Sequence, residues 1–91
     1  MKNLNWEIIK INIAEAREEL KGIEAQIESG ELLDEVEYQI KMEHVYHHLN
    51  FAWNARNISI DRYVNLTDKD FNKFGKFPED IELAEIDLRK K

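Results

Sequence analysis

The chain contains no cysteine among its 91 residues. This excludes disulfide bonds, thiolate nucleophiles and every zinc site that is built on cysteine. The chain also lacks an apolar run near the roughly 20 residues that a membrane-spanning helix needs. Glu7 interrupts the N-terminal segment, which therefore lacks the apolar core of a signal peptide. We expect a soluble protein, and the absence of cysteine fits the cytoplasm, which we take as its location.

Basic residues are fewer than acidic residues in this chain. The chain has 13 lysines and arginines against 19 aspartates and glutamates, for a net charge of −6. Proteins that bind nucleic acid usually carry a basic stripe, but here the only basic cluster is residues 89–91 at the C-terminus. We interpret that cluster as a disordered tail. We expect neither nucleic acid nor a membrane as a partner.

Glycine and proline are scarce, with three and one in the chain, so helices can be long. We predict a first helix over about residues 5–28, with Asn5 as its N-cap and Gly30 just after its end. Asp34 opens a capping box, which predicts a second helix over about residues 34–57. Because the connection between them is short, the two helices should form an antiparallel hairpin.

The first helix has an apolar stripe with alternating spacings of three and four residues, as in a heptad repeat. The opposite face of this helix is charged. The stripe predicts contact with a single neighbour, and its predicted core residues are Trp6, Ile9, Ile13, Ala16, Leu20, Ile23 and Ile27.

The second helix is apolar on two sides. One side carries Leu33, Val36, Ile40, Phe51 and Ile58, and the other carries Tyr38, Met42, Val45, Tyr46, Leu49, Ala52 and Trp53. A helix of this kind is covered from two directions, and the first helix can cover only one. The second cover comes either from the C-terminal arm, residues 58–88, or from a second copy of the chain. The sequence leaves both possibilities open.

The C-terminal arm is predicted to contain one or two short helices. Residues 58–66 alternate loosely in hydropathy, which hints at an extended segment. Thr67 then begins a capping box for a short helix that ends at Gly75. Pro78 fits the first turn of a last helix, with Ile81, Leu83, Ala84 and Leu88 as candidates for burial.

We therefore predict an all-α fold, a single helical domain over residues 1–91 in which a long antiparallel hairpin precedes the arm. A domain this small has a thin core, and one helix has two apolar sides. Both features favour a homodimer in which two hairpins form a four-helix bundle. The alternative is a monomer in which the arm provides the whole second cover.

Three clustered histidines raise the possibility of a metal site. His44, His47 and His48 lie three or four residues apart, and Glu43 adds a carboxylate. The apolar stripe of the first helix offers no facing ligand, however, and bundle metal sites take ligands from facing helices. We therefore expect no metal and no cofactor. The alternative is a metal- or small-ligand-binding bundle that uses this cluster.

A polar strip on the second helix is the first candidate for an interaction site. The strip contains Glu43, His47, Asn50, Asn54 and Asn57, at spacings of four and three, and Tyr46 and Trp53 lie beside it. Exposed aromatic residues of this kind are enriched at interfaces. A solvated strip, with both aromatic rings buried, is the alternative reading.

Catalysis has little support in the sequence. Neither serine lies in a nucleophile-elbow context, and no glycine-rich phosphate loop is present. We predict no catalytic residues. The expected function is that of a non-enzymatic protein–protein interaction or self-association module, whose partner is a second copy or another protein.

Overall fold

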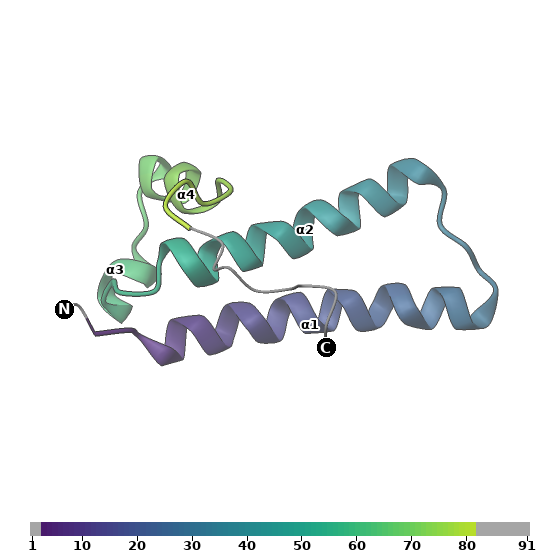
Figure 1. Cartoon of the computed structure of the whole chain (residues 1–91), viewed down its shortest axis with the longest axis horizontal. Coiled ribbons are helices and arrows are strands. Elements are labelled where there is room, and N and C mark those ends of the chain that lie inside the picture. Colours follow the sequence, from purple (N-terminus) through teal and green to yellow (C-terminus); the bar gives the residue numbers. More distant parts are fainter. Residues whose placement is uncertain (1–2, 82–91) are drawn as a thin grey trace.

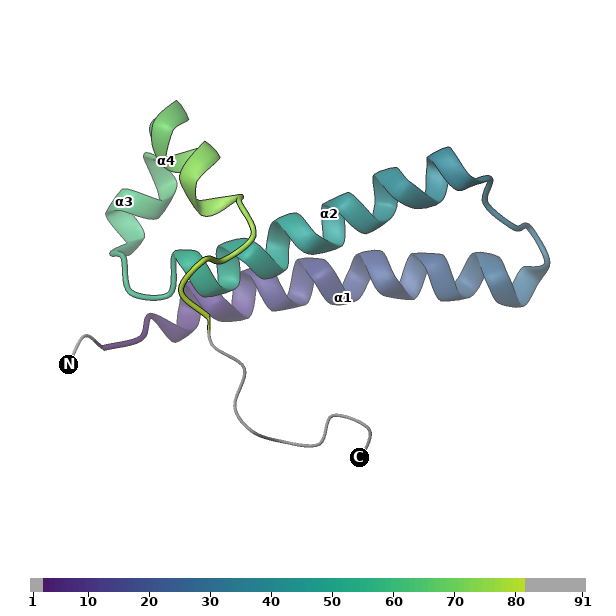
Figure 2. The same cartoon turned by 45° about the horizontal axis from the view of Figure 1, so that its top comes forward.

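A computed structural model describes residues 3–81, and that part of the chain is helical without strands. Two long helices lie side by side and antiparallel, and two short ones gather where the first begins and the second ends (Figures 1 and 2). The predicted all-α hairpin with a helical arm is confirmed. We call residues 56–81 the lobe. The helices are α1 (Trp6–Ser29), α2 (Glu35–Asn54), α3 (Ile60–Val64) and α4 (Asp68–Phe74).

The helix starts agree with the predicted caps. The side chains of Asn5, Asp34 and Thr67 each accept a hydrogen bond from the backbone N–H three residues further on. Gly30 ends α1 with a φ of 80°, a left-handed conformation that favours glycine. These local signals fix where the helices begin and where the hairpin turns.

One predicted helix boundary and one predicted extended segment differ from the structure. α2 ends at Asn54 and not at residue 57, because the chain turns at Ala55 and the Arg56 guanidinium donates to the Trp53 carbonyl at 2.7 Å. The extended segment predicted for residues 58–66 is instead occupied by α3. Its start is capped by Ser59, whose hydroxyl accepts from a backbone N–H at 3.1 Å.

The predicted last helix lies mostly outside the described residues. Residues 78–81 are not helical. Leu83, Ala84, Leu88 and the tail predicted at residues 89–91 fall beyond the part that the structure describes.

The core is concentrated at the lobe end of the hairpin. Ile8 of α1, Phe51 and Ala55 at the end of α2, and Phe74 of α4 form one buried cluster. Half-buried residues of the lobe close this cluster from outside, namely Ile58, Ile60, Tyr63 and Leu66. The helices of the arm therefore cover the Phe51 side of α2, and the arm reaches the Tyr46 side only at the end of α2.

The predicted core stripe of α1 is rotated relative to the observed one. The buried residues of this helix are Ile8, Asn12, Ala16 and Ile23. Four residues predicted as core are exposed: Trp6 by 68%, Ile13 by 47%, Leu20 by 42% and Ile27 by 59%. The apolar residues of α1 span a wider arc than one helix contact can cover, and α2 packs against only one edge of that arc. No other part of residues 3–81 buries the other edge.

The hairpin is closely packed at only one end. Val45 is the first buried residue of α2, so its first ten residues, 35–44, contain none. The two long helices separate toward the connection at residues 30–34, as both views show (Figures 1 and 2). On α2, Val45 and Ala52 share the side of His48, which bonds to Asn12 of α1. That side is the contact with α1.

Candidate interaction surface

Two asparagines of the predicted strip, Asn50 and Asn54, hold the end of α4. Asn50 donates its side-chain amide to the Gly75 carbonyl at 2.9 Å. Asn54 donates to the carbonyls of Phe74 at 2.9 Å and Lys76 at 2.7 Å. The last carbonyls of a helix have no partner within the helix, so these amides satisfy them from outside. The middle of the strip therefore serves as an internal contact between α2 and the lobe.

His47 is part of an aromatic cluster. Its ring centroid lies 4.7 Å from that of Phe51 and 5.1 Å from that of Phe71. Burial lowers the pKa of His47 below its usual value, and the nearby rings of His48 and His44 lower the pKa further. The neutral imidazole is thus the form that packs between α2 and α4.

His48 belongs to a buried polar network that the sequence did not reveal. Asn12 is only 2% exposed, and its amide donates to the Ile8 carbonyl and to the Tyr63 hydroxyl, each at 3.0 Å. Its side-chain oxygen lies 3.2 Å from Nδ1 of His48, which must donate because that oxygen can only accept. The network joins α1, α2 and α3. Its only sign in the sequence is a lone asparagine beside an apolar stripe.

The remaining residues of the predicted metal cluster do not converge. Nδ1 of His44 lies 3.8 Å from a carboxylate oxygen of Glu19 on α1, and Glu43 is exposed. Within residues 3–81, no three histidine or acidic side chains are placed to hold a metal ion. His44 and His48 contact α1, through Glu19 and Asn12, whereas His47 contacts α4 through Phe71.

Trp53 is half-buried under the end of the lobe. Its indole nitrogen donates to Oδ1 of Asp80 at 3.0 Å, and the Arg56 guanidinium lies 4.0 Å from the ring centroid. The Trp53 hydrogen bond is the main cause that lowers the pKa of Asp80, with Arg56 as a weaker one. Residues 76–81 therefore cross one end of the side on which Tyr46 is exposed.

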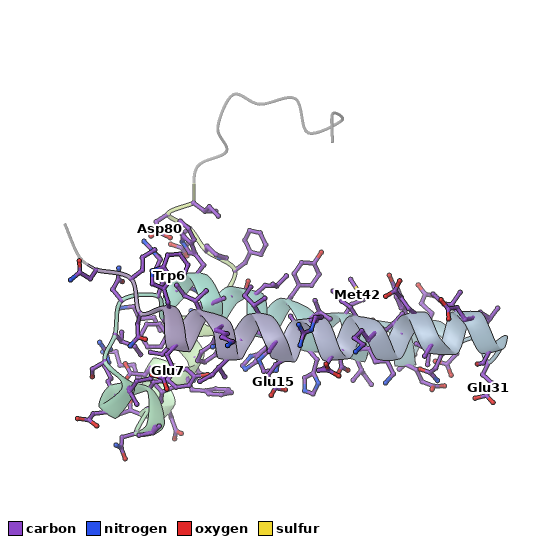
Figure 3. The ribbon with its side chains drawn as sticks, turned by 90° about the horizontal axis from the view of Figure 1, so that it is seen from below. Trp6, Glu7, Glu15, Glu31, Met42 and Asp80 are labelled. Atoms are coloured by element: carbon purple, nitrogen blue, oxygen red, sulfur yellow. The ribbon has the colours of Figure 1, made fainter. Side chains whose placement is uncertain are left out.

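Within residues 3–81, exposed apolar side chains of both long helices gather on that side of the hairpin, with the charged Arg17 and Glu24 among those of α1. Figure 3 shows Trp6 of α1 and Met42 of α2 pointing to one side, while Glu7, Glu15 and Glu31 point to the other. On α1, residues that follow Trp6 at intervals of seven share this side. On α2, residues that lie three or four positions apart from Met42 onward in either direction share it too. We define the apolar face by these eight residues: Trp6, Ile13, Leu20 and Ile27 of α1, and Tyr38, Met42, Tyr46 and Leu49 of α2.

The members of the apolar face are well exposed. Tyr38 is 47% exposed, Tyr46 49% and Leu49 41%, while Met42 is half-buried. Of the predicted interaction residues, Tyr46 lies on this face and Trp53 lies at its end. The four residues from α1 were predicted as core. The signal that could have identified them is the width of the apolar arc, which exceeds what one neighbouring helix needs.

A groove opens between the end of α2 and the lobe. Its volume is about 830 Å³, and the predicted strip residues Asn54 and Asn57 are among those that line it. Five of its lining side chains are basic: Arg56, Arg62, Lys69, Lys73 and Lys76. Two further lining residues, Glu79 and Asp80, are acidic, so the groove keeps an excess of positive charge in a chain whose net charge is −6.

Comparison of the chain with protein-family models, with curated proteins and with solved structures finds no match. Among the described residues, no helix combines the length and the apolar character that crossing a bilayer requires.

Proposed function

We propose that this protein is a non-enzymatic helical module that self-associates through the apolar face, with a second copy of the chain as its partner. The observation that carries this proposal is the row of exposed apolar side chains along both long helices. Exposed apolar surface of this extent is unusual on a protein that works alone, and it marks interaction sites. Two such faces packed together form a four-helix bundle.

The size of the apolar face fits a dimer. At 1.5 Å per residue, the distance along α1 from Trp6 to Ile27 is about 32 Å. Two adjacent helices are together about 20 Å wide, so the face covers about 600 Å² of each copy. Two copies would bury about 1,200 Å², which is at the lower end of the range for specific interfaces.

The thin core supports the same proposal. Only eight apolar residues of the described chain are buried, and most of them lie at the lobe end. The half of the hairpin near its connection buries only Ile23 of α1 and no residue of α2 before Val45. A second copy over the apolar face would give that half the apolar contacts that it lacks among residues 3–81.

Sedimentation equilibrium of the full chain tests the proposal. We expect the mass of a dimer, twice 10.9 kDa, at micromolar concentrations. Leu20→Lys and Tyr46→Lys should each weaken the dimer at least about tenfold, because each places a charge in the apolar contact. Both residues are already exposed, so circular dichroism should show unchanged helix content.

Ile40→Lys is the matched control. Ile40 is 57% exposed and lies two residues from Tyr38 on the same helix, about 200° around its axis from it and therefore away from the apolar face. Its substitution should leave the dimer unchanged. A wild-type chain that stays monomeric up to about 100 μM would overturn the proposal, since a specific homodimer interface of this size should assemble well below that concentration.

A further inference from the structure

We infer that the two copies pack in opposite directions, with α1 crossing over α1 of the second copy and each lobe beside the hairpin connection of the other. This inference rests on the proposed function, since it concerns the orientation of the same dimer. Two features of the single chain carry it. One is the shape of the apolar face, and the other is the distribution of charge along the hairpin.

Residues 76–81, which we call the raised segment, project above the apolar face at the lobe end. Asp80 lies on the same side as Trp6 and Met42 in Figure 3, beyond the side chain of Trp6. Its hydrogen bond to Trp53 holds residues 76–81 across the end of α2. Phe77 in this segment is 67% exposed. As far as residues 3–81 are concerned, a second copy therefore meets a step at the lobe end and an open surface toward the connection.

The two ends of the hairpin also differ in charge. Residues 22–41 contain six acidic residues and a single basic one, Lys41. The lobe with the end of α2, residues 54–81, has five acidic and five basic residues, and all five basic ones line the groove. The acidic residues of the connection end are Glu24, Glu28, Glu31, Asp34, Glu35 and Glu37.

A symmetric dimer that joins the apolar faces can be built in two ways. A two-fold axis parallel to the helices places like ends together, so the raised segments collide and the acidic ends repel each other. A two-fold axis across the helices places opposite ends together. Each raised segment then lies past the open end of the other copy, and each acidic end lies beside a lobe with its cationic groove. Shape and charge thus favour the same orientation.

Spin labels measure the orientation directly. Because the chain has no cysteine, Glu28→Cys gives a single labelling site at the connection end of α1. With opposite directions, the two labels of a dimer should be more than about 30 Å apart, from the rise of 1.5 Å per residue. With equal directions, they should be within about 20 Å, since packed helices lie 8–10 Å apart.

A mixed dimer provides the internal check. Lys10→Cys places a label near the start of α1, where the side chain is also exposed. In a mixture of chains labelled at residues 28 and 10, the proposed orientation gives a short distance between the two different labels. Short distances between identical labels at residue 28 would overturn the orientation and leave the dimer standing. If the spin labels show no dipolar coupling between copies and the chain has the mass of a monomer, the proposed dimer is overturned as well.

Charge variants test the electrostatic part. Glu24→Gln together with Glu28→Gln should weaken the dimer about two- to fivefold relative to a control of equal net charge. That control is Glu7→Gln together with Glu15→Gln, two exposed glutamates that point away from the apolar face (Figure 3). A tighter dimer for the first pair would show that the acidic ends repel each other, and this would contradict the proposed orientation.

Discussion

The side-chain amide of Asn12 donates to the Tyr63 hydroxyl at 3.0 Å, which joins the first long helix to α3 across 51 positions of the chain. The same side chain also contacts Nδ1 of His48. A fully satisfied polar network inside a small core ties its elements together, whereas a broken one leaves buried groups without partners. This asparagine therefore fixes how α1, α2 and the lobe are placed.

We expect Asn12→Ala to lower the free energy of unfolding by about 2 kcal/mol, because it leaves Tyr63 and His48 without their common partner. Tyr63→Phe should cost about 1 kcal/mol, since it removes one of these bonds. Urea unfolding at one fixed protein concentration measures both. The exposed Asn72→Ala is the control, and it should change stability by less than about 0.5 kcal/mol. Strictly additive costs in the double variant would contradict a shared network.

The hydrogen bonds of Asn54 make a second prediction. Asn54→Ala removes the donor for two carbonyls at the end of α4, so we expect a loss of about 1–2 kcal/mol. Amide hydrogen exchange should become faster in α4 than in α1, because the lobe loses its attachment to α2. The matched control is Asn57→Ala, from the same strip, whose side chain makes no hydrogen bond within residues 3–81. Equal acceleration in both variants would argue against this role of Asn54.

The helix starts were predictable because their signals are local. Asn5, Asp34 and Thr67 each bond to a backbone group three residues away, so the sequence alone contains both partners. The role of Asn54 was not predictable, because its partners lie 20 and 22 residues further along the chain. A polar side chain on a helix looks the same in the sequence whether it meets water or another helix end.

The burial of α1 was misjudged for a related reason. A heptad stripe identifies which residues avoid water, and it does not say which of them the chain itself will cover. Here α2 takes the edge that contains Ile8 and Ala16, and Ile13 and Leu20 are left outside. The apolar pattern of α1 therefore contains the residues of two surfaces, namely the contact with α2 within the hairpin and the apolar face.

Acidification should destabilise the folded chain through His47. Burial between aromatic rings lowers the pKa of this imidazole below 6.5, its usual value, so the folded state binds fewer protons than the unfolded state. The free energy of unfolding is therefore highest at pH values above 6.5, and it decreases as the pH falls from 6.5 toward the lowered pKa of the folded state. We expect a lower melting temperature at pH 5.5 than at pH 7.5. The carboxylates with lowered pKa values, such as Asp80, remain charged throughout this window.

His47→Phe should reduce that difference in melting temperature, because it keeps an aromatic ring against Phe71 and removes the titrating group. His44→Gln is the control, and it should change this difference only slightly, since the His44 side chain is 66% exposed and is the weakest of the causes that lower the pKa of His47. An unchanged pH dependence in the His47 variant would show that another group is responsible.

Gly22 and Gly30 should respond in opposite directions to the same substitution. Gly22 lies within α1 in a helical conformation, and a Cβ there would have no heavy atom within 4 Å. Gly22→Ala should therefore raise the free energy of unfolding by about 0.5–1 kcal/mol, since alanine loses less backbone entropy in a helix. Gly30 has equal space but a φ of 80°, so Gly30→Ala should cost about 1 kcal/mol. Urea unfolding of both variants at equal concentration measures the difference, and a stabilising Gly30→Ala would contradict the left-handed turn that ends α1.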